Sequence, residues 1–142
     1  MSDSNSTSNS VYTIKFTLID GKPVFILMHD GHQVSDAIEI EDEIATLDFR
    51  LEAELPDDNY TAALGTNLQW LSDDNRAPIA MPENFTFNRV NGSNFLLVNK
   101  NTGNAIFHFV YFVVLSSDDD AIIYASPDPV IINKKPPVSG NG

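Results

Sequence analysis

Two histidines in the segment His29-Asp30-Gly31-His32 are the first side chains in this sequence that could do chemistry. They stand three positions apart at an expected turn. A zinc site needs further ligands converging on the same point, and Asp30, Asp36 or Glu39 could supply one. Two histidines at this spacing in a loop are nevertheless a weak signal, and exposed histidines flanking an Asp-Gly turn are the commoner outcome. His29 and His32 are therefore weak metal candidates.

Runs of aspartate in presumed loops form a second group of candidates. They are Asp57-Asp58, Asp73-Asp74 and Asp118-Asp119-Asp120. Several carboxylate oxygens at one end of a β-sandwich can bind Ca²⁺, but the spacing of an EF-hand loop is absent from the sequence. Asp is also an ordinary turn residue. We keep Asp118, Asp119 and Asp120 as weak calcium candidates and predict no bound metal and no cofactor.

The sequence contains no recognisable catalytic motif. Ser, His and Asp are present, but a nucleophile elbow, a Gly-rich phosphate loop and a metalloprotease helix are all missing. His108 stands among Ile106, Phe107, Phe109 and Val110. A histidine in an apolar strand is more typical of a core or interface than of a catalytic base. We predict that the protein is not an enzyme.

Charge and composition exclude several classes of partner. The 142 residues include 8 Lys and Arg against 20 Asp and Glu, a formal net charge of −12. Such a field repels phosphate, so we expect neither nucleic acid nor an anionic membrane surface as a partner. The chain has no cysteine and hence no disulfide. We see neither a secretory signal nor an apolar run long enough to span a bilayer, and therefore expect a cytoplasmic protein.

Hydrophobic residues alternate with a period of two along most of the chain. Tyr12–Leu18 and Leu47–Ala53 each place one face inside and one outside, and Asp20-Gly21 suits a tight hairpin turn. Within the ambiguous window Val34–Ala45 the alternation favours a strand. Tyr60–Leu64 and Asn67–Leu71 are expected to form one strand broken at Gly65. Further strands are expected at Pro23–Met28, Phe85–Phe87, Asn94–Asn99, Ala105–Leu115, Ala121–Ala125 and Val130–Ile132.

Short strands separated by frequent turns predict an all-β fold, a Greek-key, immunoglobulin-like β-sandwich of about 8 strands without a disulfide. The Ser- and Asn-rich residues 1–10 and the residues 134–142 have the composition of disordered tails. Between them, residues 11–133 are expected to form a single domain.

The segment Ala125-Ser126-Pro127-Asp128-Pro129-Val130-Ile131-Ile132-Asn133, together with the Thr-Leu-Ile-Asp-Gly hairpin near the start, resembles the small bacterial DP-EP family. More distantly the chain is similar to inclusion-body and quorum-linked β-sandwich proteins. It departs from the family pattern in having no Glu-Pro dipeptide. The resemblance implies one sandwich domain of unknown biochemical role and carries over no catalytic residue, cofactor or substrate.

Ala105–Leu115 is apolar on both faces. A two-layer sandwich buries only one face of each sheet, so something must cover the other. Either a loop such as Ser72–Asn84 folds over it or a second subunit does. We favour an isologous dimer, with His108, Val110, Phe112 and Val114 at the interface, or else the residues of the opposite face of the same strand.

Two function classes follow from these observations. One is a non-catalytic binding or assembly module that associates with itself through an apolar sheet face and can present acidic loops to a protein partner. The other is a small-ligand or cation-binding protein that uses the loop aspartates or the His29/His32 pair.

Overall fold

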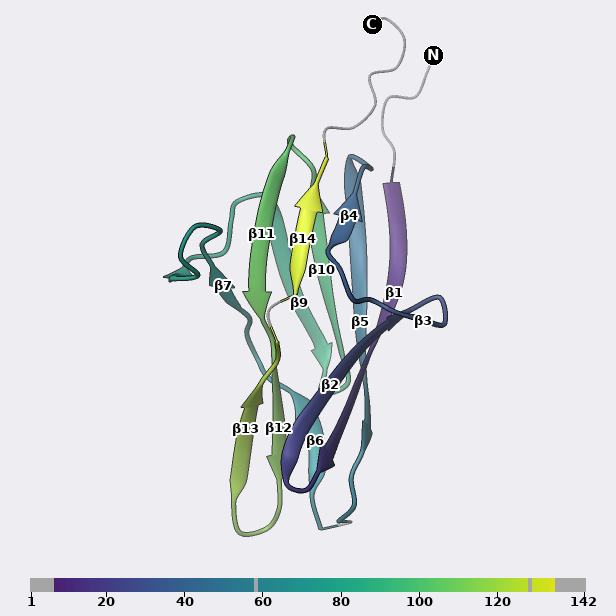
Figure 1. Ribbon diagram of the computed structural model, residues 1–142, viewed down its shortest axis with the longest axis vertical. Helices are drawn as coiled ribbons and strands as arrows, with labels where there is room; N and C mark the ends of the chain where they lie inside the picture. Colours follow the sequence, from purple (N-terminus) through teal and green to yellow (C-terminus); the bar gives the residue numbers. More distant parts are fainter. Residues whose placement is uncertain (1–6, 58, 128, 135–142) are drawn as a thin grey trace, which may run out of the picture.

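The computed structural model describes residues 7–57, 59–127 and 129–134, which form an all-β structure of packed sheets (Figure 1). The predicted all-β sandwich is confirmed. The described residues form fourteen strands rather than about eight, because very short strands flank the longer ones and one long predicted strand is divided. No helix in this part of the chain has the length and apolar character needed to cross a membrane.

The first layer is a six-stranded sheet in the order β3-β2-β1-β5-β10-β9. Its strands are β1 (Thr7–Ile19), β2 (Lys22–His29), β3 (His32–Gln33), β5 (Ile44–Glu54), β9 (Phe85–Asn91) and β10 (Asn94–Lys100). The prediction that residues 1–10 form a disordered tail is wrong for residues 7–10. Thr7–Ser10 already belong to β1, because they pair in parallel with Ile44–Leu47 of β5. The strand begins here because the backbone groups of these residues pair with β5, and polar side chains do not prevent such pairing.

The turns of the first layer have the backbone that their residues predict. Asp20 and Gly21, between β1 and β2, have φ of 52° and 76°. Asp30 and Gly31, between β2 and β3, have φ of 51° and 77°. Positive φ at both central positions is the geometry of the type I′ turn that matches the twist of a hairpin.

The second layer consists of a five-stranded sheet, β4-β14-β11-β7-β8, and a three-stranded sheet, β13-β12-β6. The strands are β4 (Ile38–Ile40), β6 (Thr61–Leu64), β7 (Gln69–Leu71), β8 (Pro78–Ile79), β11 (Ala105–Val110), β12 (Phe112–Ser116), β13 (Ala121–Ala125) and β14 (Val130–Asn133). The prediction of a strand within Val34–Ala45 is thus confirmed. The strands β6 and β7, which precede and follow the segment that includes Gly65, fall in different sheets.

The predicted strand Ala105–Leu115 is divided at Tyr111. The amide of Tyr111 donates to the Ser126 hydroxyl at 3.0 Å, and the amide of Ser126 donates to the Tyr111 carbonyl at 2.8 Å. Ser126 lies in the segment joining β13 to β14, so this segment changes sheets where the long strand does. Local alternation gave no sign of the break, because the side chains keep their alternation through it.

An aromatic core fills the space between the layers. Phe49 stacks on Phe95 with ring centroids 4.7 Å apart and on Tyr12 at 5.2 Å, all three from the first layer. Phe109 of the second layer meets Phe49 edge-on at 6.1 Å. Trp70, which the sequence suggested as a core aromatic, lies 5.4 Å from Phe109. Interlocking rings of this kind fix the two layers against each other.

The buried phenol of Tyr111 gives a pH-dependent prediction. Burial raises the pKa of Tyr111 well above its ordinary value of 10.0. The native state therefore opposes ionisation, and the stability linked to the neutral phenol is present below pH 10 and falls as the pH rises above it. We expect wild-type stability in urea to fall more steeply in this alkaline range than that of Tyr111→Phe. The control Tyr124→Phe removes a different hydroxyl, and equal slopes for wild type and Tyr111→Phe would refute the prediction.

Candidate interaction surface

The strands β11 and β12 bury one face and turn the other outward. Their inward residues are Phe107, Phe109, Tyr111, Val113 and Leu115, which belong to the core or pack against it. On the outward face, Ile106 is 45% exposed, whereas Val110, Phe112 and Val114 are half-buried. The outward face is therefore partly covered by the chain itself.

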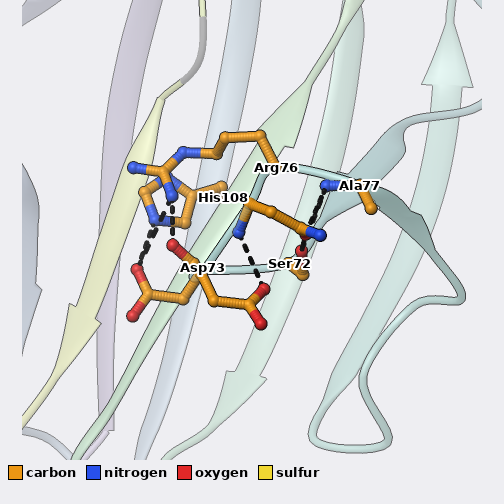
Figure 2. A network of polar contacts seen from close by, with 7 residues as sticks. Ser72, Asp73, Arg76, Ala77 and His108 are labelled. Atoms are coloured by element: carbon orange, nitrogen blue, oxygen red, sulfur yellow. Dashed lines mark hydrogen bonds and ion pairs between the residues drawn. The ribbon is translucent and has the colours of Figure 1, made fainter.

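His108 lies on this outward face and is only 3% exposed. Its Nε2 lies 2.8 Å from a carboxylate oxygen of Asp73, in the loop between β7 and β8 (Figure 2). The loop thus covers His108, which is the alternative to a second subunit that the sequence left open. The prediction of His108 as an interface residue needs correction, because the chain's own fold leaves it almost no surface for a partner.

The covering loop is held in shape by short-range hydrogen bonds. The Ser72 hydroxyl donates to the Asn75 side chain at 2.6 Å and accepts from the Ala77 amide at 3.0 Å. The Arg76 guanidinium donates to the Asp73 carbonyl. These bonds fix Asp73 over His108. The Ser72 hydroxyl thus bonds to residues of its own loop and helps to hold the turn.

Beyond His108, the outward face continues over the sheet β6-β12-β13 and is apolar there. Val114 pairs with Ile123 on one side and with Ala63 on the other, so the three side chains form a row across the sheet. Phe112 is next along the strand on the same face. Ile123 is 66% exposed, the largest exposure among the large hydrophobic residues of the described chain.

A groove of about 490 Å³ lies on this face. Its lining is apolar apart from one charged residue, Arg89 of β9, and the polar pair Thr66 and Asn67. The guanidinium of Arg89 donates to the Leu64 carbonyl through Nε at 3.3 Å and Nη2 at 3.1 Å. Within the described residues, no carboxylate forms an ion pair with Arg89. We call Ala63, Phe112, Val114, Ile123 and Arg89 the outer patch.

The histidine pair is brought together but is not completed as a metal site. His29 and His32 lie opposite each other in the β2–β3 hairpin. The His29 ring stacks on Tyr12 at 4.6 Å, and its Nδ1 lies 3.0 Å from the Val11 carbonyl. His32 is exposed. Across residues 7–57, 59–127 and 129–134, no three His, Cys, Asp or Glu side chains are placed to hold a metal ion.

The three aspartates of the β12–β13 turn are exposed and organised by Ser117. Its hydroxyl accepts from the amides of Asp119 and Asp120 at 3.3 and 3.2 Å and donates to the Asp120 carboxylate at 2.8 Å. The nearby Asp120 carboxylate raises the pKa of the Tyr60 phenol. The turn is thus an ordered acidic tip. Asp58 and Asp128, named above in the Asp-Asp and Asp-Pro motifs, lie outside the described residues.

Sequence reasoning named Phe112 and Val114 of the outer patch and missed Ile123 and Arg89. The register of β12 with β13 places Ile123 beside Val114, and the Asn91-Gly92 hairpin carries Arg89 to β6. No protein-family model matches the chain, and no curated protein is similar to it. The function must therefore be inferred from the surface itself.

Proposed function

We propose that this protein is a non-catalytic assembly module, whose copies associate through the outer patch on the sheet β6-β12-β13. A two-fold dimer is the simplest closed arrangement of identical copies, because each then uses the same patch. The DP-EP resemblance is compatible with this proposal and adds no ligand, cofactor or catalytic residue to it.

One observation carries the proposal. Phe112, Val114 and Ile123 form a continuous apolar surface around the groove, and the protein's own loops leave Ile123 two-thirds exposed. The His108 end of the same outward face, by contrast, is covered by the β7–β8 loop. Contiguous apolar surface beside polar residues marks an interaction site more often than isolated exposed residues do.

The experiment compares the solution mass of wild type and Ile123→Asp by light scattering after size exclusion. A carboxylate buried in the centre of an apolar contact loses its hydration and gains no hydrogen bond or opposite charge in return. The variant should therefore be monomeric where wild type is dimeric. Ile19→Asp is the matched control, because Ile19 is 57% exposed at the end of β1 in the other layer. A monomeric wild type, or equal loss of mass in both variants, would refute the proposal.

A further inference from the structure

We propose that the second copy docks face to face with its strands reversed, so that the acidic turn Asp118–Asp120 of each copy meets Arg89 of the other. This inference rests on the proposed function and specifies the orientation of the partner. It is drawn from the charges at the two ends of the outer patch.

Arg89 supplies the positive end. The chain has 8 basic residues against 20 acidic ones, so a positive charge at any one surface is uncommon in it. Within the described residues no ion pair joins Arg89 to a carboxylate, and Arg89 is the one charged residue among those that line the groove. Its hydrogen bonds to the Leu64 carbonyl use Nε–H and one N–H of Nη2. A guanidinium has five N–H donors, so several remain for an incoming carboxylate.

The acidic turn supplies the negative end. Arg89 donates to the carbonyl of Leu64, and Leu64 pairs with Val113 near the start of β12. Asp118 lies at the other end of this strand, just after its last residue, Ser116. At about 3.4 Å per residue, the three positions from Val113 to Ser116 span roughly 10 Å, and Asp118 lies beyond them in the turn. The outer patch therefore has the positive charge of Arg89 at one end and adjoins the acidic turn at the other. Its apolar side chains lie between these opposite charges.

This charge pattern selects one orientation. If the second copy packed with its strands in the same direction, each acidic turn would lie over the other, and like charges in a contact are costly. Reversing the strands places each turn over the partner's Arg89. The two-fold axis then crosses near the level of Leu115 and Ile122, which pair with each other midway along the patch. Val114 and Ile123 lie beside it, so their side chains become buried.

Charge reversal tests the orientation. Arg89→Glu should weaken self-association about tenfold or more, and the double change Asp118→Lys with Asp119→Lys should do the same. Asp118 and Asp119 are chosen because the carboxylate of Asp120 is already engaged by Ser117. Putting all three substitutions in one chain should restore association, because every contact is again between opposite charges. Misfolding of either variant does not produce such a rescue.

Mixing provides a second measurement. The Arg89→Glu protein and the Asp118→Lys/Asp119→Lys protein should each be largely monomeric alone and should form a mixed dimer together. In the mixed dimer one contact pairs the new glutamate with the new lysines, and the other is the original one. Sedimentation velocity of the two proteins, separate and mixed, measures this directly.

The outcomes separate this inference from the proposed function. If wild type dimerises, Ile123→Asp is monomeric, and neither the triple variant nor the mixture shows rescue, the orientation is wrong and the assembly function stands. If wild type is monomeric, both are wrong. If decanoate, an apolar chain with a carboxylate, raises the melting temperature of monomeric wild type but not that of Arg89→Glu, the groove holds an amphiphile and the inference is overturned.

Discussion

Replacing Phe49 with alanine is expected to lower the free energy of unfolding by about 3–5 kcal/mol. Phe49 is fully buried at the centre of the aromatic core, stacked between Tyr12 and Phe95 and met edge-on by Phe109. Its removal leaves a cavity and breaks ring contacts within and between the layers. Domains of this size are stable by only about 5–15 kcal/mol, so a large share of the total is lost. Urea unfolding followed by circular dichroism measures the change.

The matched control is Phe87→Ala. Phe87 lies on the edge strand β9, is half-buried, and packs against Phe95 at 5.3 Å. Because neighbours enclose it less completely, its loss should cost less than that of Phe49. Equal destabilisation by the two substitutions would mean that the aromatic stack does not form the centre of the core.

Asn99→Leu is expected to destabilise the fold by about 2–4 kcal/mol, a loss comparable with that of Phe49 although no cavity is created. Asn99 of β10 and Asn133 of β14 are both buried and lie in different layers. Their side-chain amides bond reciprocally at 2.6 and 3.1 Å, and Asn84 adds a third bond to Asn99 at 3.0 Å. Leucine at position 99 leaves the Asn133 amide buried without these partners.

The double variant Asn99→Leu with Asn133→Leu separates the hydrogen bonds from packing. When both partners of a buried polar pair become apolar, the penalty for an unpaired group disappears. We therefore expect the double variant to recover a substantial part of the stability lost in Asn99→Leu, as measured by urea unfolding. A double variant whose loss equals the sum of the two single losses would contradict the assignment of this amide pair as a bridge between the layers.

The strands that could be predicted from the sequence are those fixed by local alternation. Tyr12–Leu18 and Leu47–Ala53 fall within β1 and β5, and the Asp20-Gly21 turn has the expected positive φ. The break at Tyr111 could not be predicted, because it depends on hydrogen bonds with Ser126, fifteen positions later. Asn99 was also missed. It follows Phe95 and Leu97 on the buried face, but as a polar residue before a turn it resembles the end of a strand.

The outer patch was predictable only in part for the same physical reason. The alternation of β12 places Phe112 and Val114 on the same face of the strand, but it does not show whether that face points outward. Whether such a side chain stays uncovered depends on contacts distant in sequence. The β7–β8 loop removes His108 from the surface, and the β9–β10 hairpin adds Arg89 to it. Neither contact can be predicted from the alternation of side chains along β11 and β12.

The central claim, that copies of the protein meet through the outer patch, is tested most directly by methyl NMR of isoleucine- and valine-labelled protein over a dilution series. The assembly proposal predicts that the methyl signals of Ile123 and Val114 shift with protein concentration. Those of Ile19 on the other layer and of Ile106, near the opposite end of the outward face, should stay fixed. Shifts centred on Ile106 or Ile19, or no shift at any concentration, would contradict it.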